Sequence, residues 1–215
     1  MFNVVTIARE YGSGGAEVGR RTAEMLGWKL LDKQIIERVA ALGEVDPAWA
    51  EEADEQSTRW WERVLRGFSH GGPELYIGVA DDGVNRDSLQ QFTAKVIAEA
   101  GKAGGCVIVG RGSQCVLHQE PTALRVLVYA PLQEKLARMK HRHPHERDLP
   151  ALLHHMDAER RRYAQKYFGR DSTDRHLYHL CLNSTMGLDA CAHLIVNAVH
   201  LSGTGQRAEK PEVPV

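Results

Sequence analysis

The amino-acid sequence predicts an α/β fold of three layers, in which a parallel β-sheet carries helices on both faces. Apolar runs rich in β-branched residues occur at 2–8, 106–109, 124–129 and 180–182, and stretches with apolar residues at helical spacing lie between them. The runs are almost continuously apolar, which is typical of strands that are buried on both faces. Their alternation with helices favours a parallel sheet covered on both sides.

The length and composition indicate one domain with a polar tail. The 215 residues are 43% hydrophobic and 26% charged, enough to bury one sizeable core. We expect a single domain over 1–202 and a disordered tail over 203–215, where the sequence is polar and contains proline. The formal net charge of -1 provides no positive field for non-specific nucleic-acid binding, so we expect no nucleic-acid partner.

The cysteines and the N-terminal sequence favour the cytoplasm. The four cysteines (Cys106, Cys115, Cys181 and Cys191) show no C-x-x-C spacing, so the sequence predicts small buried thiols in a reducing compartment and neither zinc nor disulfides. The start MFNVVTIARE becomes charged too early for a signal peptide, and no apolar run approaches the roughly 20 residues of a membrane-spanning helix. We therefore expect a cytoplasmic protein without a membrane partner.

The first strand leads directly into a glycine-rich loop and a helix. The turn-rich sequence Tyr-Gly-Ser-Gly-Gly at 11–15 follows the run at 2–8, and apolar residues then recur among charged ones from Ala16 to Gly27. A short apolar run at 28–31 precedes Asp32. Further helices are predicted at 33–42, 88–103, 114–118, 132–141 and 188–201.

Two polar segments interrupt this alternation. Residues 44–87 contain adjacent tryptophans and a Gly-Gly-Pro breaker, and we expect them to form a helical insertion. Residues 141–174 turn strongly basic, and we expect a mobile lid there. The histidines of this segment alternate in a proline-interrupted stretch without fixed ligand geometry, so we predict no metal site. They are His141, His143, His145, His154 and His155.

The glycine loop has the physical character of an anion site. Backbone N–H groups converge between a strand and a helix, and the helix dipole favours a negative charge there. The usual phosphate-loop pattern is G-x-x-x-x-G-K-S/T. If Gly14 precedes the lysine position, Gly15 replaces the lysine and Ala16 replaces the magnesium-binding hydroxyl. The alternative to a phosphate site is a tight strand-to-helix turn that has only a packing role. The candidate phosphate-binding residues are Arg9, Gly12, Ser13, Gly14, Gly15, Ala16 and Glu17.

A wider set of motifs resembles a known family. The sequence VTIAREYGSGGAEVGRRTAEMLGWKLLD at 5–32 is similar to the start of bacterial cytidylate kinases, and its string R-E-Y-G-S-G-G resembles a hallmark of the cytidylate kinase-like family. The resemblance continues at Arg38, at 110–112, at Asp157 with Arg160, and at 182–185. It implies a fold of the P-loop kinase type, with 44–87 as an insertion on the acceptor side and 141–174 as the lid.

The resemblance also implies residues that bind the phosphate acceptor. An arginine six residues after the Asp of the L-L-D motif holds the monophosphate in cytidylate kinases, which corresponds to Arg38 after Asp32 here. Arg111 follows the strand at 106–109, at the carboxyl end where open α/β sheets bind ligands. A guanidinium fork suits a phosphate, although surface arginines often only pair with carboxylates. Asp157 lies three residues before Arg160 and forms either an acceptor site or an ordinary helical salt bridge with it.

Arginines of the predicted lid are candidates for catalysis. Phosphoryl transfer needs positioning and the neutralisation of negative charge more than covalent help. Lid arginines, or Arg9 beside the loop, could therefore supply charge that the absent lysine would have given. The candidate catalytic residues are Arg160, Arg162 and Arg170.

Three functional hypotheses follow. The first is an enzyme that uses ATP and Mg²⁺ to phosphorylate a nucleotide or small phosphorylated substrate, with CMP or dCMP implied by the resemblance. The second is a nucleotide-binding sensor or regulatory protein with little turnover, because the loop lacks its lysine. The third is a dinucleotide-binding oxidoreductase, since Gly12, Gly14 and Gly19 loosely resemble a Rossmann loop. The predicted phosphate-binding arginines argue against this third hypothesis, and whether the protein forms a homodimer stays open.

Overall fold

A single parallel sheet organises the molecule. The computed structural model describes residues 1–33, 36 and 86–204. The described strands follow the order β2-β3-β1-β4-β5, with β1 at the centre. Every neighbouring pair is parallel, so all the carboxyl ends meet at one edge of the sheet. The strands are β1 (Val4–Arg9), β2 (Lys29–Leu31), β3 (Cys106–Val109), β4 (Ala123–Tyr129) and β5 (Leu180–Asn183).

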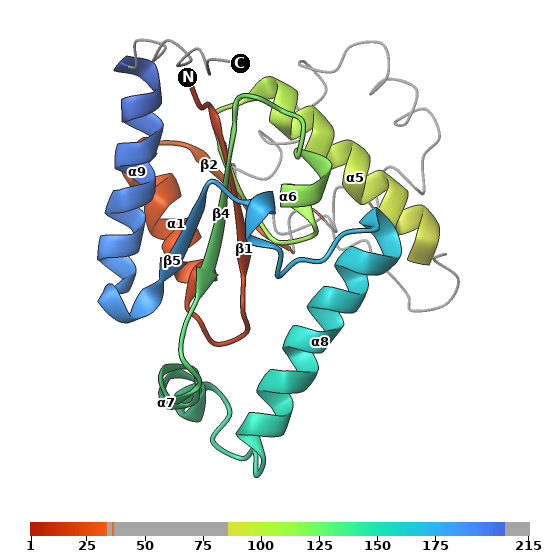
Figure 1. Cartoon of the computed structure of the whole chain (residues 1–215), viewed down its shortest axis with the longest axis vertical. Helices are drawn as coiled ribbons and strands as arrows, with labels where there is room; N and C mark the ends of the chain where they lie inside the picture. Colours follow the sequence, from red (N-terminus) through yellow and green to blue (C-terminus); the bar gives the residue numbers. More distant parts are fainter. Residues whose placement is uncertain (34–35, 37–85, 205–215) are drawn as a thin grey trace, which may run out of the picture.

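Helices cover both faces of the sheet, as the sequence predicts. On one face, α1 (Gly15–Leu26) packs against α9 (Leu188–Thr204), and on the other lie α5 (Arg86–Ala103) and α6 (Ser113–Val116) (Figure 1). The helices α7 (Leu132–Arg142) and α8 (Leu149–Phe168) pack together beyond the carboxyl end of the sheet. Two short 3₁₀ helices, η1 (Arg175–Leu177) and η2 (Ser184–Met186), flank β5.

The alternation of side chains along β1 explains its continuous apolar character. Val5 and Ile7 are fully buried in the core under α1 and α9. Val4, pointing to the opposite face, is fully buried in the core under α5. Both faces of the central strand are therefore dry, as a sheet between two helical layers requires.

Several element boundaries differ from the predicted ones. The first strand begins at Val4 instead of residue 2, and α5 begins at Arg86 instead of residue 88. The predicted tail starts too early, because α9 continues to Thr204. Ser202 holds this last turn in place: its Oγ donates to Val199 O and accepts a hydrogen bond from Phe2 N at 2.8 Å.

Most of the predicted lid at 141–174 is a regular helix. Asp148 caps the start of α8 by accepting a hydrogen bond from Ala151 N, and Gly169 ends the helix in a left-handed conformation. Movement of this segment stays a prediction. The other predicted segment, 44–87, lies outside the described residues except for its last two positions, as does most of the helix predicted at 33–42.

The cysteines are only partly as predicted. Cys106 and Cys191 are buried, but Cys115 is half-buried and Cys181 is exposed. Cys181 lies on β5, the edge strand, one face of which is open at this position. None of the helices in the described ranges is long and apolar enough to cross a membrane.

The core under α9 offers a matched test of the packing. Ile195 is completely buried, whereas its neighbour Leu194 is 41% exposed. We expect Ile195→Ala to lower the free energy of unfolding by about 2–4 kcal/mol, because it removes buried surface and leaves a cavity. Leu194→Ala should change it by less than about 0.5 kcal/mol. Urea unfolding of both variants measures the difference, and equal losses would contradict the described orientation of α9.

Candidate functional site

The carboxyl ends of the central strands open into a cavity of about 740 Å³. Its walls come from the ends of β1, β3 and β4, from the lid helix α8, and from the segment before β5. Positive side chains are prominent in these walls, which makes the cavity suited to an anion. The charged residues that line it are Arg9, Glu10, Lys33, Arg111, Lys135, Asp157, Glu159, Arg160 and Arg161.

The glycine loop lies between β1 and α1, as predicted. Gly14 is the N-cap residue of α1 in a left-handed conformation, and no side chain caps the helix. The first amide groups of a helix have no carbonyl partner within it. Those of Gly15, Ala16 and Glu17 are therefore suited, together with the helix dipole, to hold an oxyanion.

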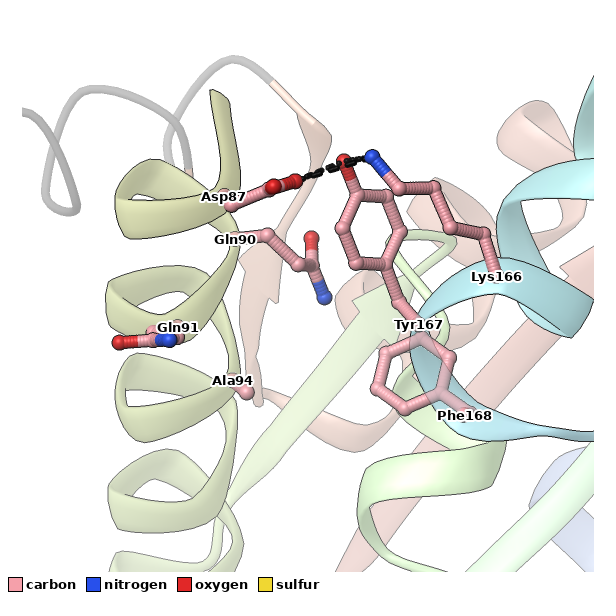
Figure 2. Close-up of a pocket in the computed structure, with 7 residues that line it drawn as sticks. All are labelled: Asp87, Gln90, Gln91, Ala94, Lys166, Tyr167 and Phe168. Atoms are coloured by element: carbon pink, nitrogen blue, oxygen red, sulfur yellow. Dashed lines mark hydrogen bonds and ion pairs between the residues drawn. The ribbon is translucent and has the colours of Figure 1, made fainter. Parts of the chain in front are cut away.

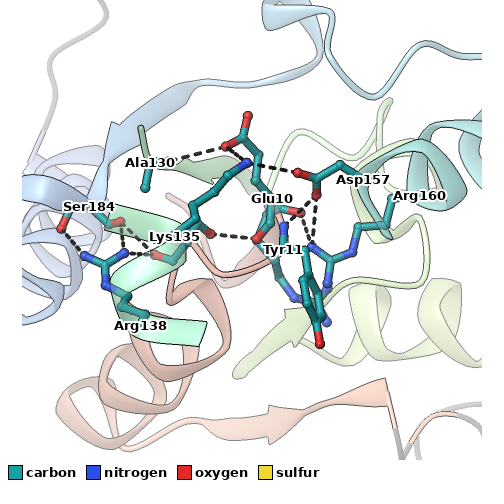
Figure 3. A network of polar contacts seen from close by, with 10 residues as sticks. Glu10, Tyr11, Ala130, Lys135, Arg138, Asp157, Arg160 and Ser184 are labelled. Atoms are coloured by element: carbon teal, nitrogen blue, oxygen red, sulfur yellow. Dashed lines mark hydrogen bonds and ion pairs between the residues drawn. The ribbon is translucent and has the colours of Figure 1, made fainter. Parts of the chain in front are cut away.

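The loop is held from behind by Arg138 of α7 and Ser184 of η2. Arg138 Nη1 donates to Ser13 O at 2.9 Å and to Ser184 Oγ at 2.8 Å (Figure 3). Ser184 Oγ in turn donates to Ser13 O at 2.7 Å. The hydroxyl of Ser13, which is fully buried, donates to Glu10 O within the same loop. The Ser13 side chain thus shapes the loop from inside and is turned away from the solvent.

A buried lysine joins three elements at the loop. Lys135 Nζ of α7 lies 3.0 Å from Glu10 Oε2 and 3.0 Å from Asp157 Oδ2 of α8 (Figure 3). Asp157 Oδ1 also accepts a hydrogen bond of 2.6 Å from Tyr11 N. Burial disfavours the charge of Lys135, but the hydrogen bonds to Asp157 and Glu10 outweigh it, so the pKa of Lys135 is raised.

Arg160 reaches the same loop from α8. Its Nη1 donates to Arg9 O at 2.7 Å and lies 3.9 Å from Asp157 Oδ1, and its guanidinium covers the ring of Tyr11. The helical salt bridge foreseen for Asp157 and Arg160 therefore exists, but both side chains also bind the loop. Burial lowers the pKa of Arg9 to about 10, Arg160 acts in the same direction, and Asp32 opposes both.

The turn after β3 presents Arg111 with a strained backbone. Arg111 has a φ of 56°, a left-handed conformation that costs roughly 1–2 kcal/mol for a residue with a side chain. Its guanidinium lies 5.4 Å from the centre of the Tyr163 ring and lines the cavity. Strain of this kind is often stored at functional sites.

A model of the cytidylate kinase-like family matches residues 4–186. The chain belongs to this family. A search of curated proteins found no match. The family and the sheet give the chain the nucleotide-binding fold of the P-loop kinases. The oxidoreductase hypothesis is wrong, because β3 separates β1 from β2 in this sheet, whereas a Rossmann sheet places the second strand directly beside the first.

Solved structures are similar to the chain over nearly its whole length. One is an uncharacterized protein from Eubacterium ventriosum, with a TM-score of 0.67 and 18% identity over 93% of this chain and 99% of that one. At this identity the likeness shows the fold alone. A shikimate kinase from Acinetobacter baumannii has a TM-score of 0.49 and 15% identity, covering 96% and 97% of the two chains. A gluconokinase from Sinorhizobium meliloti has a TM-score of 0.48 and 13% identity, covering 93% and 97%.

The structure brings together only some of the residues that the family resemblance suggested. Arg9, Arg111, Asp157 and Arg160 meet in the cavity. Asp32 follows β2 at the same edge of the sheet and acts electrostatically on Arg9. Arg38 lies outside the described residues.

Two predicted catalytic arginines lie away from the cavity walls. Arg162 pairs with Glu159 at 2.6 Å on the exposed side of α8. Arg170 is exposed and follows Gly169, the residue that ends this helix. In this conformation neither residue lines the cavity, so their catalytic role stays a prediction.

Glu17, another predicted phosphate ligand, is engaged elsewhere. Hydrogen bonds from Arg20 and Arg21 hold its pKa at about 2. Both partners lie along the exposed side of α1, so the Glu17 carboxylate is part of a surface ion-pair network. Only its backbone amide remains a candidate for phosphate binding.

Sequence reasoning missed Lys135 and Arg138. They are three residues apart in α7 and so lie on one helix face, which is the one signal that could have found them. Charged residues on an amphipathic helix usually face solvent, and the fold was needed to see that this face is turned to the loop. The described residues contain no group of three His, Cys, Asp or Glu side chains that could hold a metal ion.

A second, smaller hollow lies between α5 and α8. It has a volume of about 420 Å³, and Asp87 of α5 faces Lys166 and Tyr167 of α8 across it (Figure 2). Asp87 Oδ1 lies 2.9 Å from Lys166 Nζ and accepts a hydrogen bond of 3.0 Å from the Tyr167 hydroxyl. These contacts tie the end of α8 to the start of α5.

Removing the Lys135 cation should destabilise the protein. Lys135→Met keeps the apolar stem but leaves the carboxylates of Glu10 and Asp157 beside each other without a counter-charge. We expect the free energy of unfolding to fall by about 2 kcal/mol at neutral pH. Lys140→Met, on the exposed side of the same helix, is the control and should change it by less than about 0.5 kcal/mol. Urea unfolding measures both.

The contribution of Lys135 should be insensitive to pH in the neutral range. Because its folded-state pKa lies above the ordinary value of 10.5, its stabilisation is complete below that pH and is lost as the pH rises through the folded pKa. The difference between wild type and Lys135→Met should therefore stay constant from about pH 6 to about pH 9. A difference that vanished within this range would contradict the ion-pair account.

Proposed function

We propose that the protein transfers the γ-phosphate of ATP to a nucleoside monophosphate, with CMP or dCMP as the first acceptors to test. The observation that carries this proposal is the cavity at the carboxyl edge of the sheet, where Arg9, which leads into the phosphate loop, converges with Arg111 and Arg160. Membership of the cytidylate kinase-like family supports it. A cytoplasmic location, where ATP is abundant, would suit this activity.

The geometry suits a reaction that is governed by charge. An oxygen of the acceptor phosphate attacks the γ-phosphorus of ATP, the bond to the β–γ bridging oxygen breaks, and ADP leaves. The loop amides bind the phosphates of ATP, while Arg111 binds the acceptor phosphate by a charge-assisted fork. Arg160 neutralises charge on the transferred group. We assign Asp32, Arg38 and Asp157 to the acceptor side, and keep Arg162 and Arg170 as lid arginines that would have to move to take part.

The described residues do not form a dedicated magnesium site. Ala16 stands where the usual loop has a hydroxyl ligand, and the carboxylates of Glu10 and Asp157 are paired with Lys135. Mg²⁺ is commonly held through substrate phosphates and water, with few protein ligands. We therefore expect the ion to arrive with ATP, where it would neutralise phosphate charge.

A nucleotide-binding sensor with little turnover is the second candidate. It is favoured by Gly15 and Ala16, which replace the two side chains that the usual phosphate loop uses for the γ-phosphate and the metal. Turnover separates the two functions. A spectrophotometric assay that follows ADP release from ATP and Mg²⁺ across a panel of monophosphates should show turnover that depends on the acceptor. ATP binding without turnover on any acceptor would favour the sensor.

Arg111 should act on the acceptor and not on ATP. Arg111→Asn removes the guanidinium with a residue that tolerates the left-handed backbone. We expect the KM for the acceptor to rise about 10- to 100-fold, while the KM for ATP changes less than about threefold. Arg142→Ala, an exposed arginine of α7 outside the cavity walls, should change neither. Equal effects on both substrates would place Arg111 outside the acceptor site.

A further inference from the structure

Besides Ala16, the phosphate loop departs from the usual pattern at two positions that are linked. In G-x-x-x-x-G-K-S/T the second glycine precedes the lysine, and Gly14 takes that place here. The first glycine of the pattern then falls on residue 9, which is arginine. The chain thus has arginine where the pattern has glycine, and glycine at 15 where the pattern has lysine.

The two positions share one space in the structure. A Cβ atom on Gly15 would lie 2.6 Å from Arg9 Cβ and 3.3 Å from Arg9 Cγ, and contacts below 3.0 Å are essentially never seen for real Cβ atoms. Arg9 Cβ is attached directly to the backbone of the central strand, so it cannot swing aside as the end of a flexible side chain could. A lysine at position 15 would therefore require a small residue at position 9.

The guanidinium of Arg9 lies in the wall of the cavity at the carboxyl edge of the sheet. It lies against Gly110, at the carboxyl end of β3, where any side chain would collide with Arg9 Nη1. This places its charge in the cavity wall beside Arg111 and in reach of the electrostatic effect of Asp32. Arg9 thus lies between the phosphate loop and the arginine assigned to the acceptor.

Three other cations beside the loop already bond to protein groups, although Arg160 does so through its Nη1 atom. Lys135 lies between two carboxylates, Arg138 is bonded to Ser13 O and to Ser184, and Arg160 is bonded to Arg9 O. Within the described part of the chain, the Arg9 guanidinium makes no ion pair. Burial and the charge of Arg160 both act against its positive charge, and an anion between the two arginines would relieve this.

We propose that Arg9 replaces the phosphate-loop lysine, so that the cation on the transferred phosphate comes from the end of β1 instead of the head of α1. This inference rests on the proposed function and deepens it, because it makes the absence of the lysine compatible with turnover. The loop has exchanged a glycine–lysine pair for an arginine–glycine pair, and the exchange should be reversible by substituting both positions.

A double-mutant cycle with Arg9→Gly, Gly15→Lys and the double variant tests the exchange. Arg9→Gly should lower kcat about 100-fold or more, because it removes charge from the transition state. Gly15→Lys alone should lower the melting temperature and should not raise kcat above that of wild type, because the new side chain collides with Arg9. The double variant should be more stable than Gly15→Lys and regain at least about tenfold in kcat over Arg9→Gly.

Arg9→Met keeps the apolar stem in place and guards against a folding defect in the glycine variant. It should lower kcat about 100-fold with little change in melting temperature. If wild type turns over and Arg9→Met keeps at least a third of its kcat, the inference is overturned while the proposed function stands.

ATP binding, measured by calorimetry, decides the case in which wild type has no turnover and the proposed function fails. A roughly tenfold weaker affinity of Arg9→Met for ATP would still support a phosphate contact by Arg9, and an unchanged affinity would overturn it. If wild type binds neither ATP nor pyrophosphate, the inference fails together with the proposed function.

Discussion

The shape of the phosphate loop depends on a single buried ammonium group. Lys135 lies between Glu10, at the start of the loop, and Asp157, whose other oxygen accepts the Tyr11 amide. Two carboxylates in such a half-buried place would repel each other without a cation between them. The lysine thus joins β1, α7 and α8 at the point where the loop leaves the sheet. The Arg138 contacts to Ser13 O and Ser184 O then hold the far side of the loop to η2.

Crowding at the end of β1 is the second constraint on the site. The strand ends at Arg9, and the helix begins with Gly15 packed directly on the stem of that arginine. Only one of these two positions can carry a side chain while the backbone keeps this course. The absence of the usual lysine therefore follows from packing around Arg9. It does not by itself indicate a loop that has lost its function.

The sequence predicted much of the fold because periodicity and glycines report local geometry. The strand, glycine loop and helix at the N-terminus follow from continuous apolar character and from Gly14, and Arg111 could be placed because it directly follows a buried strand. The order of the strands was beyond reach, since β2 has only three residues and β3 pairs with it across a long sequence separation. Lys135 and Arg138 were missed because a charged helix face usually indicates solvent, and only the tertiary packing of α7 turns that face to the loop.

The middle and the C-terminal end of α8 are held by contacts of different character, which bears on how a lid could work. At its middle, Asp157 and Arg160 bind backbone groups of the loop in half-buried surroundings, where hydrogen bonds to charged groups are strong. At its end, Lys166 and Asp87 form a pair in which both side chains are 62% exposed, and water screens such pairs. The exposed pair therefore contributes less to the position of α8 than the contacts at the loop do. In the function that we propose, Arg160 would therefore keep its place at the loop, and the far end of the helix would be the part that moves for an incoming acceptor.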